Sequence, residues 1–436
     1  MRRSRLVLVL VLAFVLVVYL TVIKQHYDSH NALPLRHPAP KAFLSPDWLL
    51  GGRVQFGIMF DAGSTGTRVH IFKFRVDHNK SRVPELLEEF FKAFSPGLSA
   101  FAEDPPQCRV GLLQLLDFAQ TKVPVQVHGS TPVFLKATAG LRLLQGDQAN
   151  RLLNQVRAEF LASPFLSSDQ SVSILDGSDE GISAWLTVNF LLGAVGGTTA
   201  SVGTLDLGGG STQVTFSPSS KFVESMSSSS DFQNLSLFTS SYSLYTHSYL
   251  GLGLMEARAA VLGPPSAPGG GVLLSPCMSP GEVGTWQHDH VLYSVRGQRT
   301  GEGTDEGTDE GTGSVFEACS RRVRSILKDT VRAVEPQQQF YAFSYYYDRA
   351  VDIGAIDEGR GGEVRVRDYS SAAQRVCAGE TLSPDLSPLL CLDLVYISVL
   401  LQELGFSPDS QLKLARRIRG VETSWALGAT FSYMNL

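Results

Sequence analysis

Two segments that begin with aspartate place the strongest constraint on how this chain can fold. Asp61-Ala-Gly-Ser-Thr-Gly-Thr-Arg68 and Asp206-Leu-Gly-Gly-Gly-Ser-Thr-Gln213 each follow an apolar run. Each then continues through glycine and hydroxyl residues into a second run that is typical of a strand. A single segment of this kind would indicate only a hairpin. Two matching strand–loop–strand units predict two related lobes that face each other across a cleft.

The residue types in these two turns suit the binding of phosphate. Glycine lets the backbone approach an anion closely and adopt positive φ, and successive N–H groups then form an anion-binding concavity. Asp61 and Asp206 lie at strand ends, where each can hold a hydrated divalent cation that neutralises phosphate oxygens. Further hydroxyl donors are Ser64, Thr65, Thr67, Ser211 and Thr212.

A third segment, Leu175-Asp-Gly-Ser-Asp-Glu180-Gly-Ile-Ser-Ala-Trp185, offers a candidate general base. Glu180 follows a predicted strand at the start of a predicted helix, and a carboxylate there can accept a proton from water. The alternative is an acid that stabilises the helix start through the helix dipole. Asp176 and Asp179 fit that alternative better than Glu180 does.

The apolar pattern predicts an α/β protein, because strands and helices alternate. Hydrophobic residues make up 43% of the chain, enough for a large core. The net charge of −5 argues against a nucleic-acid partner, which usually requires a basic excess. Strands are expected at 54–60, 69–74, 133–135, 172–175, 201–205 and 214–216. Helices are expected at 148–161, 182–192, 315–334, 392–404 and from near residue 424.

The N-terminus predicts a membrane anchor. Basic residues precede an apolar run that extends from Leu6 to Ile23, which favours a signal-anchor helix at 1–23 with a short cytosolic tip and a lumenal remainder. The alternatives are a cleaved signal peptide and a buried helix. Residues 24–52 are polar and proline-containing, which indicates a stem. Asn79-Lys-Ser and Asn234-Leu-Ser are glycosylation sequons that agree with a lumenal location.

The five cysteines allow two disulfides. Cys377 and Cys391 enclose a short proline-rich loop, and Cys277 and Cys319 enclose a longer one. In an oxidising lumen these are the natural pairs, which leaves Cys108 without a partner. The alternative is five unrelated buried thiols.

Five blocks together resemble the apyrase conserved regions of the nucleoside triphosphate diphosphohydrolase family. They are the two aspartate-led turns, the Glu180 segment, Lys136-Ala-Thr-Ala-Gly-Leu-Arg142 and Glu422-Thr-Ser-Trp-Ala-Leu-Gly-Ala429. The resemblance covers residues 54–436 and is strongest to the Golgi and secreted nucleoside diphosphatase branch. It implies two actin-like (RNase H-like) lobes with an interlobe cleft, after one N-terminal transmembrane helix. The first lobe would be 53–175, with 416–436 returning to it, and the second 176–415.

The resemblance also implies roles for individual residues. Glu180 would be the catalytic base, Ser211 and Gln213 would position the attacking water, and Asp61 and Asp206 would hold Ca²⁺ or Mg²⁺ through water. The phosphate-binding residues would be Ser64, Thr65, Gly66, Thr67, Thr138, Gly208, Gly209 and Gly210. The candidates for binding the base are Tyr345, Tyr346 and Tyr347, although a buried aromatic strand is the alternative for most of the run 340–347.

The expected function is divalent-cation-dependent hydrolysis of nucleoside diphosphates (GDP, UDP and IDP, with triphosphates less favoured) to nucleoside monophosphate and phosphate. The expected location is the Golgi membrane, as a single-pass type II protein with a lumenal catalytic domain, or a soluble secreted form after release. An exopolyphosphatase and an actin-like sugar kinase are alternative enzymes on the same fold. A non-catalytic nucleotide sensor is a third possibility. The oligomeric state and the role of Cys108 stay open.

Overall fold

The computed structural model describes residues 52–77, 83–197, 199–226, 230–238, 240–264, 271–288, 291–298, 313–334, 339–383 and 386–436. The predicted anchor, the stem up to Gly51 and the Asn79 sequon lie outside these residues. Within the described ranges, every helix is too short or too polar to cross a membrane. All the elements below belong to one compact unit, Gly52–Leu436.

A five-stranded mixed sheet has the order β3-β2-β1-β4-β5. Its central strand, β1, pairs antiparallel with β2 and parallel with β4. The inner half of β1 is fully buried, as its apolar sequence requires. The strands are β1 (Gly52–Ala62), β2 (Thr67–Asp77), β3 (Glu85–Phe94), β4 (Val133–Ala137) and β5 (Val172–Ile174).

A seven-stranded sheet has the order β14-β15-β13-β6-β7-β9-β8. Its central strand, β6, pairs antiparallel with β7 and parallel with β13. The strands are β6 (Gly203–Leu207), β7 (Ser211–Phe216), β8 (Phe232–Leu237), β9 (Ser240–Leu250), β13 (Phe340–Ser344), β14 (Gly362–Arg365) and β15 (Gln411–Leu414).

The five-stranded arrangement is repeated inside the larger sheet. Strands β9-β7-β6-β13-β15 lie side by side in the same sequential order as β3-β2-β1-β4-β5. Each pair of neighbours is parallel or antiparallel in the same way as its counterpart. Strands β8 and β14 are additions at the two edges. The two aspartate-led turns are therefore similar in sequence and also lie at equivalent places in a repeated topology.

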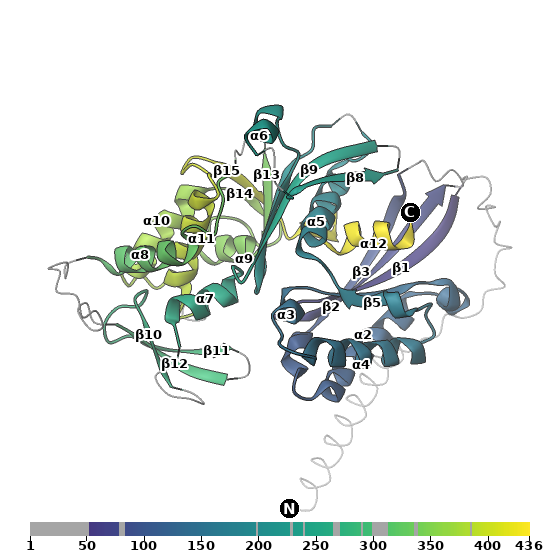
Figure 1. The fold of residues 1–436 in the computed structure, drawn as a ribbon, viewed down its shortest axis with the longest axis horizontal. Helices are drawn as coiled ribbons and strands as arrows, with labels where there is room; N and C mark the ends of the chain where they lie inside the picture. Colours follow the sequence, from purple (N-terminus) through teal and green to yellow (C-terminus); the bar gives the residue numbers. More distant parts are fainter. Residues whose placement is uncertain are drawn as a thin grey trace, which may run out of the picture. The chain divides into compact units, whose positions relative to one another are not determined.

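Helices cover both faces of the smaller sheet (Figure 1). On one face lie α2 (Arg109–Lys122) and α4 (Gln148–Ala162). On the other lie α5 (Gly177–Leu192) and α12 (Ala426–Met434), which contact each other and form a layer between the two sheets. The Phe431 ring of α12 lies 5.5 Å from that of Phe74. The C-terminal segment thus returns to the first sheet. A short helix, α3 (Ala139–Arg142), follows β4.

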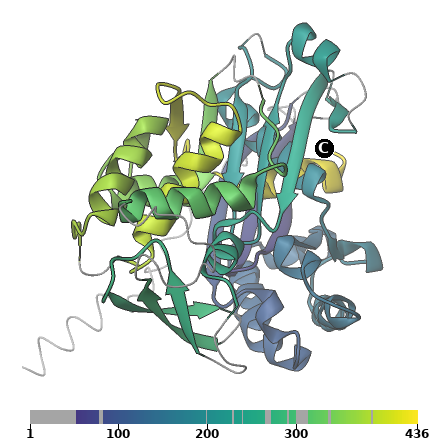
Figure 2. The same ribbon diagram turned by 60° about the vertical axis from the view of Figure 1, so that its left-hand side comes forward.

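The far face of the larger sheet carries a second helical layer, seen from another side in Figure 2. α11 is buried over most of its length because nearly all its residues are apolar. The helices are α6 (Ser220–Ser225), α7 (Leu254–Leu262), α8 (Val315–Leu327), α9 (Tyr345–Asp352), α10 (Val366–Cys377) and α11 (Leu390–Glu403). The short pair β16 (Arg417–Ile418) and β17 (Val421–Glu422) precedes α12.

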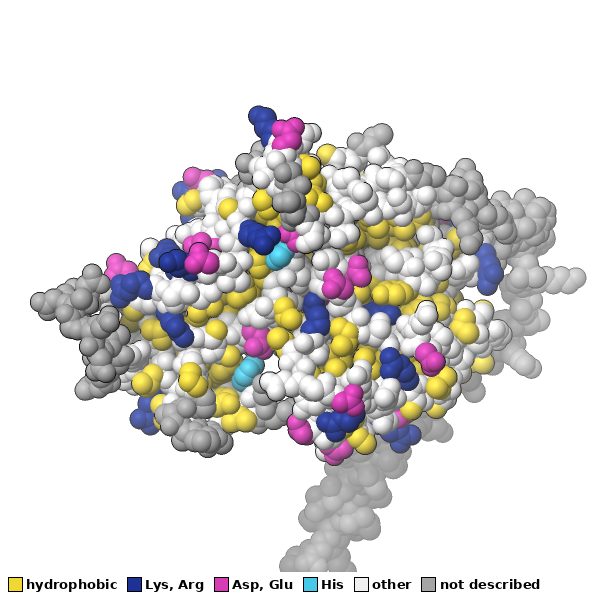
Figure 3. Space-filling view, in the orientation of Figure 1, with side chains coloured by type: hydrophobic (Ala, Val, Ile, Leu, Met, Phe, Trp, Pro, Cys, Tyr) yellow, Lys and Arg dark blue, Asp and Glu magenta, His cyan; other side chains and the backbone are white. Residues whose placement is uncertain are grey.

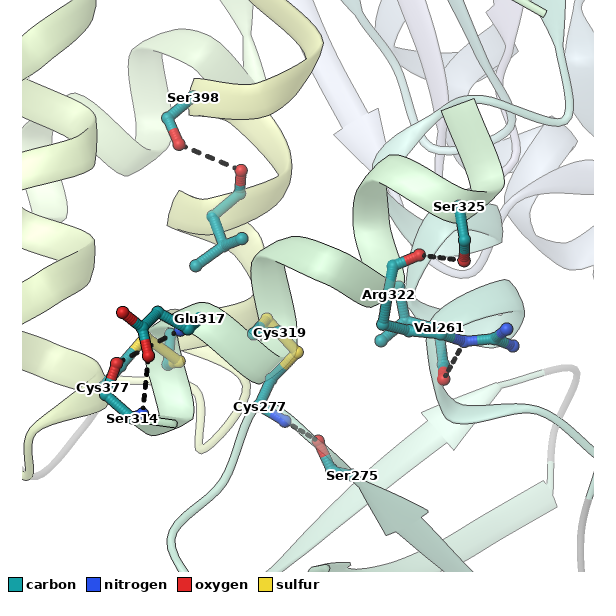
Figure 4. Close-up of a disulfide and its surroundings, with 12 residues drawn as sticks. Val261, Ser275, Cys277, Ser314, Glu317, Cys319, Arg322, Ser325, Cys377 and Ser398 are labelled. Carbon is teal, nitrogen blue, oxygen red and sulfur yellow. Dashed lines mark hydrogen bonds between the residues drawn. A yellow bond between two sulfur atoms is a disulfide. The ribbon is translucent and has the colours of Figure 1, made fainter. Parts of the chain in front are cut away.

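A three-stranded sheet is attached to this layer by a disulfide. β10 (Val272–Ser275), β11 (Val283–His288) and β12 (Val291–Gly297) form the sheet. Cys277, just after β10, is bonded to Cys319 in α8, and Arg322 of α8 donates to the Val261 carbonyl of α7 over 3.3 Å (Figure 4). A second disulfide joins Cys377 and Cys391. Both expected cysteine pairs are confirmed, and Cys108 is a buried free thiol.

Most predicted elements are found, with shifted ends. The expected helix 148–161 is α4, but the helix expected over 315–334 ends at Leu327. Asp329 adopts φ 61° in the left-handed region, which is incompatible with a continuing α-helix. The strand expected at 201–205 is β6 at 203–207, and α5 begins at Gly177 rather than at Ile182. The Asn234 sequon lies exposed on the edge strand β8.

Candidate active site

The two aspartate-led turns occupy equivalent corners of the two sheets. Asp61 of β1 lies directly opposite Arg68 of β2, and Asp206 of β6 lies directly opposite Gln213 of β7. In each case the aspartate is at the end of the central strand, and its cross-strand partner is seven positions later in the sequence. The strand register therefore places the two turns at equivalent hairpin ends, as the similarity of their sequences predicted.

The same hydrogen bond closes both turns. The backbone N–H of Gly63 donates to the Gly66 carbonyl over 3.0 Å, and the backbone N–H of Gly208 donates to the Ser211 carbonyl over 3.0 Å. Both bonds join the residues two and five positions after the aspartate. The tip of each turn is thus held in a defined shape while other N–H groups stay available for an anion.

The tips of the two turns lie against each other. A Cβ atom placed on Gly209 would be 2.3 Å from the Ser64 hydroxyl oxygen, so a larger residue at this position would force the Ser64 side chain to move. The start of α7 supports the same turn, because the N–H groups of Leu254 and Met255 donate to the carbonyls of Gly208 and Gly209 over 2.9 Å. The two sheets therefore approach each other closely at their phosphate-binding candidates.

A cavity of about 360 Å³ opens between these turns. It is lined by residues from both sheets, from α3, α5 and α9 and from the segment before α12. On the face in Figure 3, basic and acidic side chains are interspersed over the surface and form no single patch. The predicted site residues that line the cavity are Asp61, Ser64, Thr65, Thr138, Glu180, Asp206, Gly208, Gly209, Gly210, Ser211, Tyr345 and Tyr347.

Four other predicted residues lie beside the cavity without lining it. Gly66 faces the Phe94 carbonyl, and Thr67 is a buried residue that begins β2. Tyr346, the second residue of α9, has a fully buried side chain that belongs to the core. Gln213 is also buried, but its side chain reaches the residues that do line the cavity.

Glu180 lies at the centre of a hydrogen-bond network on one side of the cavity. Its Oε2 accepts a bond from the side-chain Nε2 of Gln213 over 3.2 Å and forms an ion pair with Arg142. The Gln213 Nε2 also lies 2.8 Å from the hydroxyl of Ser211 and 3.0 Å from that of Ser248. Asp176 caps α5 by accepting from the Ser178 N–H, whereas Glu180 lines the cavity.

Burial raises the pKa of Glu180 to about 8. The guanidinium of Arg142 opposes this rise, while the negative charges of Asp206 and Asp61 add to it. In its deprotonated form, a carboxylate with a raised pKa is a stronger base than an ordinary surface glutamate. Its environment therefore suits proton transfer from water.

Asp61 and Asp206 are both buried at the floor of the cavity. Oδ2 of Asp61 accepts from NH1 of Arg68 over 3.2 Å, and Oδ1 of Asp206 accepts from the Ser344 hydroxyl over 2.7 Å. Burial raises the pKa of Asp206 to about 6, the Ser344 bond opposes the rise, and the charge of Asp61 adds to it. The two carboxylates are thus close enough for an electrostatic interaction.

The donor set fits a cation that is held partly by water. Among the residues with described positions, Oδ1 of Asp61 is a buried acceptor without a hydrogen-bond partner. In the same part of the chain, no three His, Cys, Asp or Glu side chains gather closely enough to bind a metal by themselves. A divalent cation here would take its remaining ligands from water and from substrate phosphate oxygens.

Residues 50–436 match the GDA1/CD39 (nucleoside phosphatase) family. The chain belongs to this family. The resemblance found in the five sequence blocks is therefore confirmed over nearly all of the described residues.

Curated relatives of this nucleoside phosphatase are similar along most of its length. Ectonucleoside triphosphate diphosphohydrolase 6 of Rattus norvegicus is 47% identical over 402 residues, which are 91% of this chain and 85% of the rat protein. Nucleoside diphosphate phosphatase ENTPD5 of Homo sapiens is 44% identical over 382 residues, 86% of each chain. A nucleoside triphosphate hydrolase from Neospora caninum has a similar fold, with a TM-score of 0.58 at 15% identity, over 87% of this chain and 92% of that one.

Two arginines of this family member, which the sequence did not single out as site residues, pair with carboxylates at the cavity. Arg142 ends a block of small residues in the sequence, and in the structure it pairs with Glu180. Arg68 ends the first turn in the sequence, and in the structure it binds Asp61 and lines the cavity. The equal spacing from Asp61 to Arg68 and from Asp206 to Gln213 was a usable signal for cross-strand partners. The pairing of Arg142 depends on tertiary structure and left no such signal.

Proposed function

We propose that this chain hydrolyses nucleoside diphosphates to nucleoside monophosphate and phosphate. One observation carries the proposal: Glu180, Ser211 and Gln213 form a connected network on a cavity that also contains both aspartate-led turns. The names of the rat and human relatives, a diphosphohydrolase and a nucleoside diphosphate phosphatase, support this choice of reaction.

In the proposed reaction, water attacks the terminal phosphorus. The Gln213 amide and the Ser211 hydroxyl orient the water, and Glu180 accepts its proton. The backbone N–H groups of the two turns hold the phosphate oxygens. Since a base and a water-binding network are both present, a covalent phosphoenzyme is not required.

The proposed cofactor is Ca²⁺ or Mg²⁺. Asp61 and Asp206 would hold the ion through water, and the free Oδ1 of Asp61 supports this assignment. When bound, such an ion neutralises charge on the phosphate oxygens. Burial, and after it the charge of Asp61, raises the pKa of Asp206, so a counter-charge beside these two carboxylates would favour their ionised forms.

We further propose that the two sheets are the cores of two actin-like lobes, 53–175 with 416–436, and 176–415. The repeated strand order supports this division. The proposed location is the Golgi membrane with the catalytic part in the lumen. Two disulfides and the exposed Asn234 support a lumenal environment.

Phosphate release by the full-length protein tests the proposed function. GDP, UDP, IDP and the matching triphosphates are assayed with and without EDTA. Equal amounts of phosphate and nucleoside monophosphate, lost in EDTA, are expected from the diphosphates. Preference for polyphosphate would favour an exopolyphosphatase, and sugar phosphate from ATP plus glucose would favour a kinase. Nucleotide binding without turnover of any substrate would favour a sensor.

A further inference from the structure

Arg68 and Gln213 occupy equivalent positions in the two hairpins, but they face different parts of the cavity. Each is the cross-strand partner of its aspartate. The Gln213 side chain contacts Glu180, whereas the guanidinium of Arg68 contacts Asp61 and lies within the electrostatic reach of Tyr345. The same position in the repeat thus supplies an amide on one side and a permanent cation on the other.

The order of the strands shows that these are opposite sides. In the smaller sheet, β2 and β4 flank β1, which carries Asp61. Arg68 is on β2, while β4 leads to α3, whose Arg142 pairs with Glu180. Relative to Asp61, therefore, Arg68 lies on one side and the Glu180 network on the other.

The larger sheet gives the same result. Strands β7 and β13 flank β6, which carries Asp206. Gln213 is on β7, and β13 leads to Tyr345 at the start of α9. One side of the cavity thus has Glu180 and Gln213, and the other has Arg68 and Tyr345.

An in-line displacement at phosphorus would use both of these sides of the cavity. The attacking and leaving oxygens lie on opposite sides of the reacting phosphorus. If water is held beside Glu180, the leaving oxygen is directed toward Arg68. In a nucleoside diphosphate this oxygen bridges the two phosphorus atoms and departs with the nucleoside monophosphate.

Arg68 is suited to that position. Within the described residues, its guanidinium makes one hydrogen bond, to Asp61, and 36% of the side chain remains exposed. A guanidinium has five N–H donors in a planar fork that matches two phosphate oxygens. It can therefore bind a phosphate while it keeps its bond to Asp61.

We propose that Arg68 is a further catalytic residue that binds the leaving phosphate of the substrate. The step rests on the proposed function. Oxygen of water bonds to the terminal phosphorus, the proton passes to Glu180, and the bond from phosphorus to the bridging oxygen breaks. The electron pair of that bond stays on the leaving nucleoside monophosphate, where Arg68 stabilises the added negative charge.

Binding of the product gives a test that does not depend on turnover. The affinity of full-length protein for nucleoside monophosphate is measured by calorimetry in EDTA, for wild type, R68M and R68K. Loss of the guanidinium should weaken binding about tenfold or more, and lysine should restore part of it. R417M is the matched control, because Arg417 is half-exposed, pairs with Glu422 and does not line the cavity. It should bind as wild type does.

Turnover gives the second test. R68M should release phosphate from diphosphates about 100-fold more slowly than wild type. R68A should be rescued in part by guanidinium ion but not by sodium chloride of equal ionic strength. Monophosphate affinity equal to wild type in R68M, or a slow R68A that guanidinium leaves unchanged, would overturn the assignment. A wild-type protein that releases no phosphate from any diphosphate would instead overturn the proposed function and this role with it.

Discussion

The side-chain amide of Gln213 donates a hydrogen bond to Oε2 of Glu180 over 3.2 Å, although the two residues come from a strand and a helix 33 positions apart. The same carboxylate oxygen pairs with Arg142. Because an amide N–H can only donate, this bond fixes the orientation of the carboxylate relative to the second turn. The proposed base and a proposed water-orienting group are thus in direct contact with each other.

Replacing Glu180 by glutamine should abolish most turnover and leave nucleotide binding intact. Glutamine keeps the size of the side chain but cannot accept the proton of the attacking water, so phosphate release should fall by about 100-fold to 10,000-fold. Phosphate release and calorimetric binding of the metal–diphosphate complex measure the two effects. Asp179→Asn is the control on the same helix turn and should stay active. Turnover by E180Q close to wild type would rule out Glu180 as the base.

The same substitution should change how stability depends on pH. Burial raises the pKa of Glu180 from 4.5 to about 8 in the folded state. Folding therefore takes up a proton between these two values, and the wild-type protein loses stability as the pH rises through this window. Glutamine does not titrate. In EDTA, the Tm of E180Q should rise relative to wild type from pH 4.5 to about 8 and then stay level. A difference that is constant with pH would contradict this prediction.

A buried ion cluster behind the cavity should be essential for stability. Asp393 of α11 is fully buried and accepts from Nε and NH2 of Arg258 over 2.7 and 2.6 Å and from NH1 of Arg349 over 2.8 Å. Asp393→Ala would leave two arginines without their shared counter-charge, at a cost of about 3–5 kcal/mol. Urea unfolding measures the loss.

The matched control for this cluster is Asp352→Ala. Asp352 pairs with the same Arg349, over 2.9 Å, but its side chain is 21% exposed. Water can replace this partner, so we expect a loss of about 1 kcal/mol or less. Equal losses for D352A and D393A would show that burial is not what makes Asp393 important.

Most residues that gather at the cavity could be predicted from the sequence because each feature is contained in a short segment. Glycine and hydroxyl residues after an apolar strand indicated both turns, and Glu180 stood between two glycines at a helix start. The repeated spacing also indicated two related units. These predictions concern which residues can do chemistry, and they needed no knowledge of distant contacts.

Other features depend on tertiary packing and were not predicted. β3 (Glu85–Phe94) contains three Glu and two Leu, which favour helix, yet it forms a strand because β2 offers a free edge. Tyr346 and Tyr347 are both buried, yet only Tyr345 and Tyr347 line the cavity, and the run of three tyrosines did not show which of them would reach it. The Arg258–Asp393 pair joins residues 135 positions apart.

Close packing of α12 on α5 should depend on Gly428. A Cβ atom at this position would lie 2.1 Å from the Ser183 carbonyl oxygen, and the Gly428 N–H donates to the Thr187 hydroxyl over 2.8 Å. Gly428→Ala should therefore push the two helices apart and cost about 1–3 kcal/mol. Gly129→Ala is the control, since a Cβ there meets nothing within 4 Å. Because α5 carries Glu180, activity should fall in G428A as well, measured as phosphate release below the melting transition. An alanine variant as stable and active as wild type would show that this helix contact has no influence on the site.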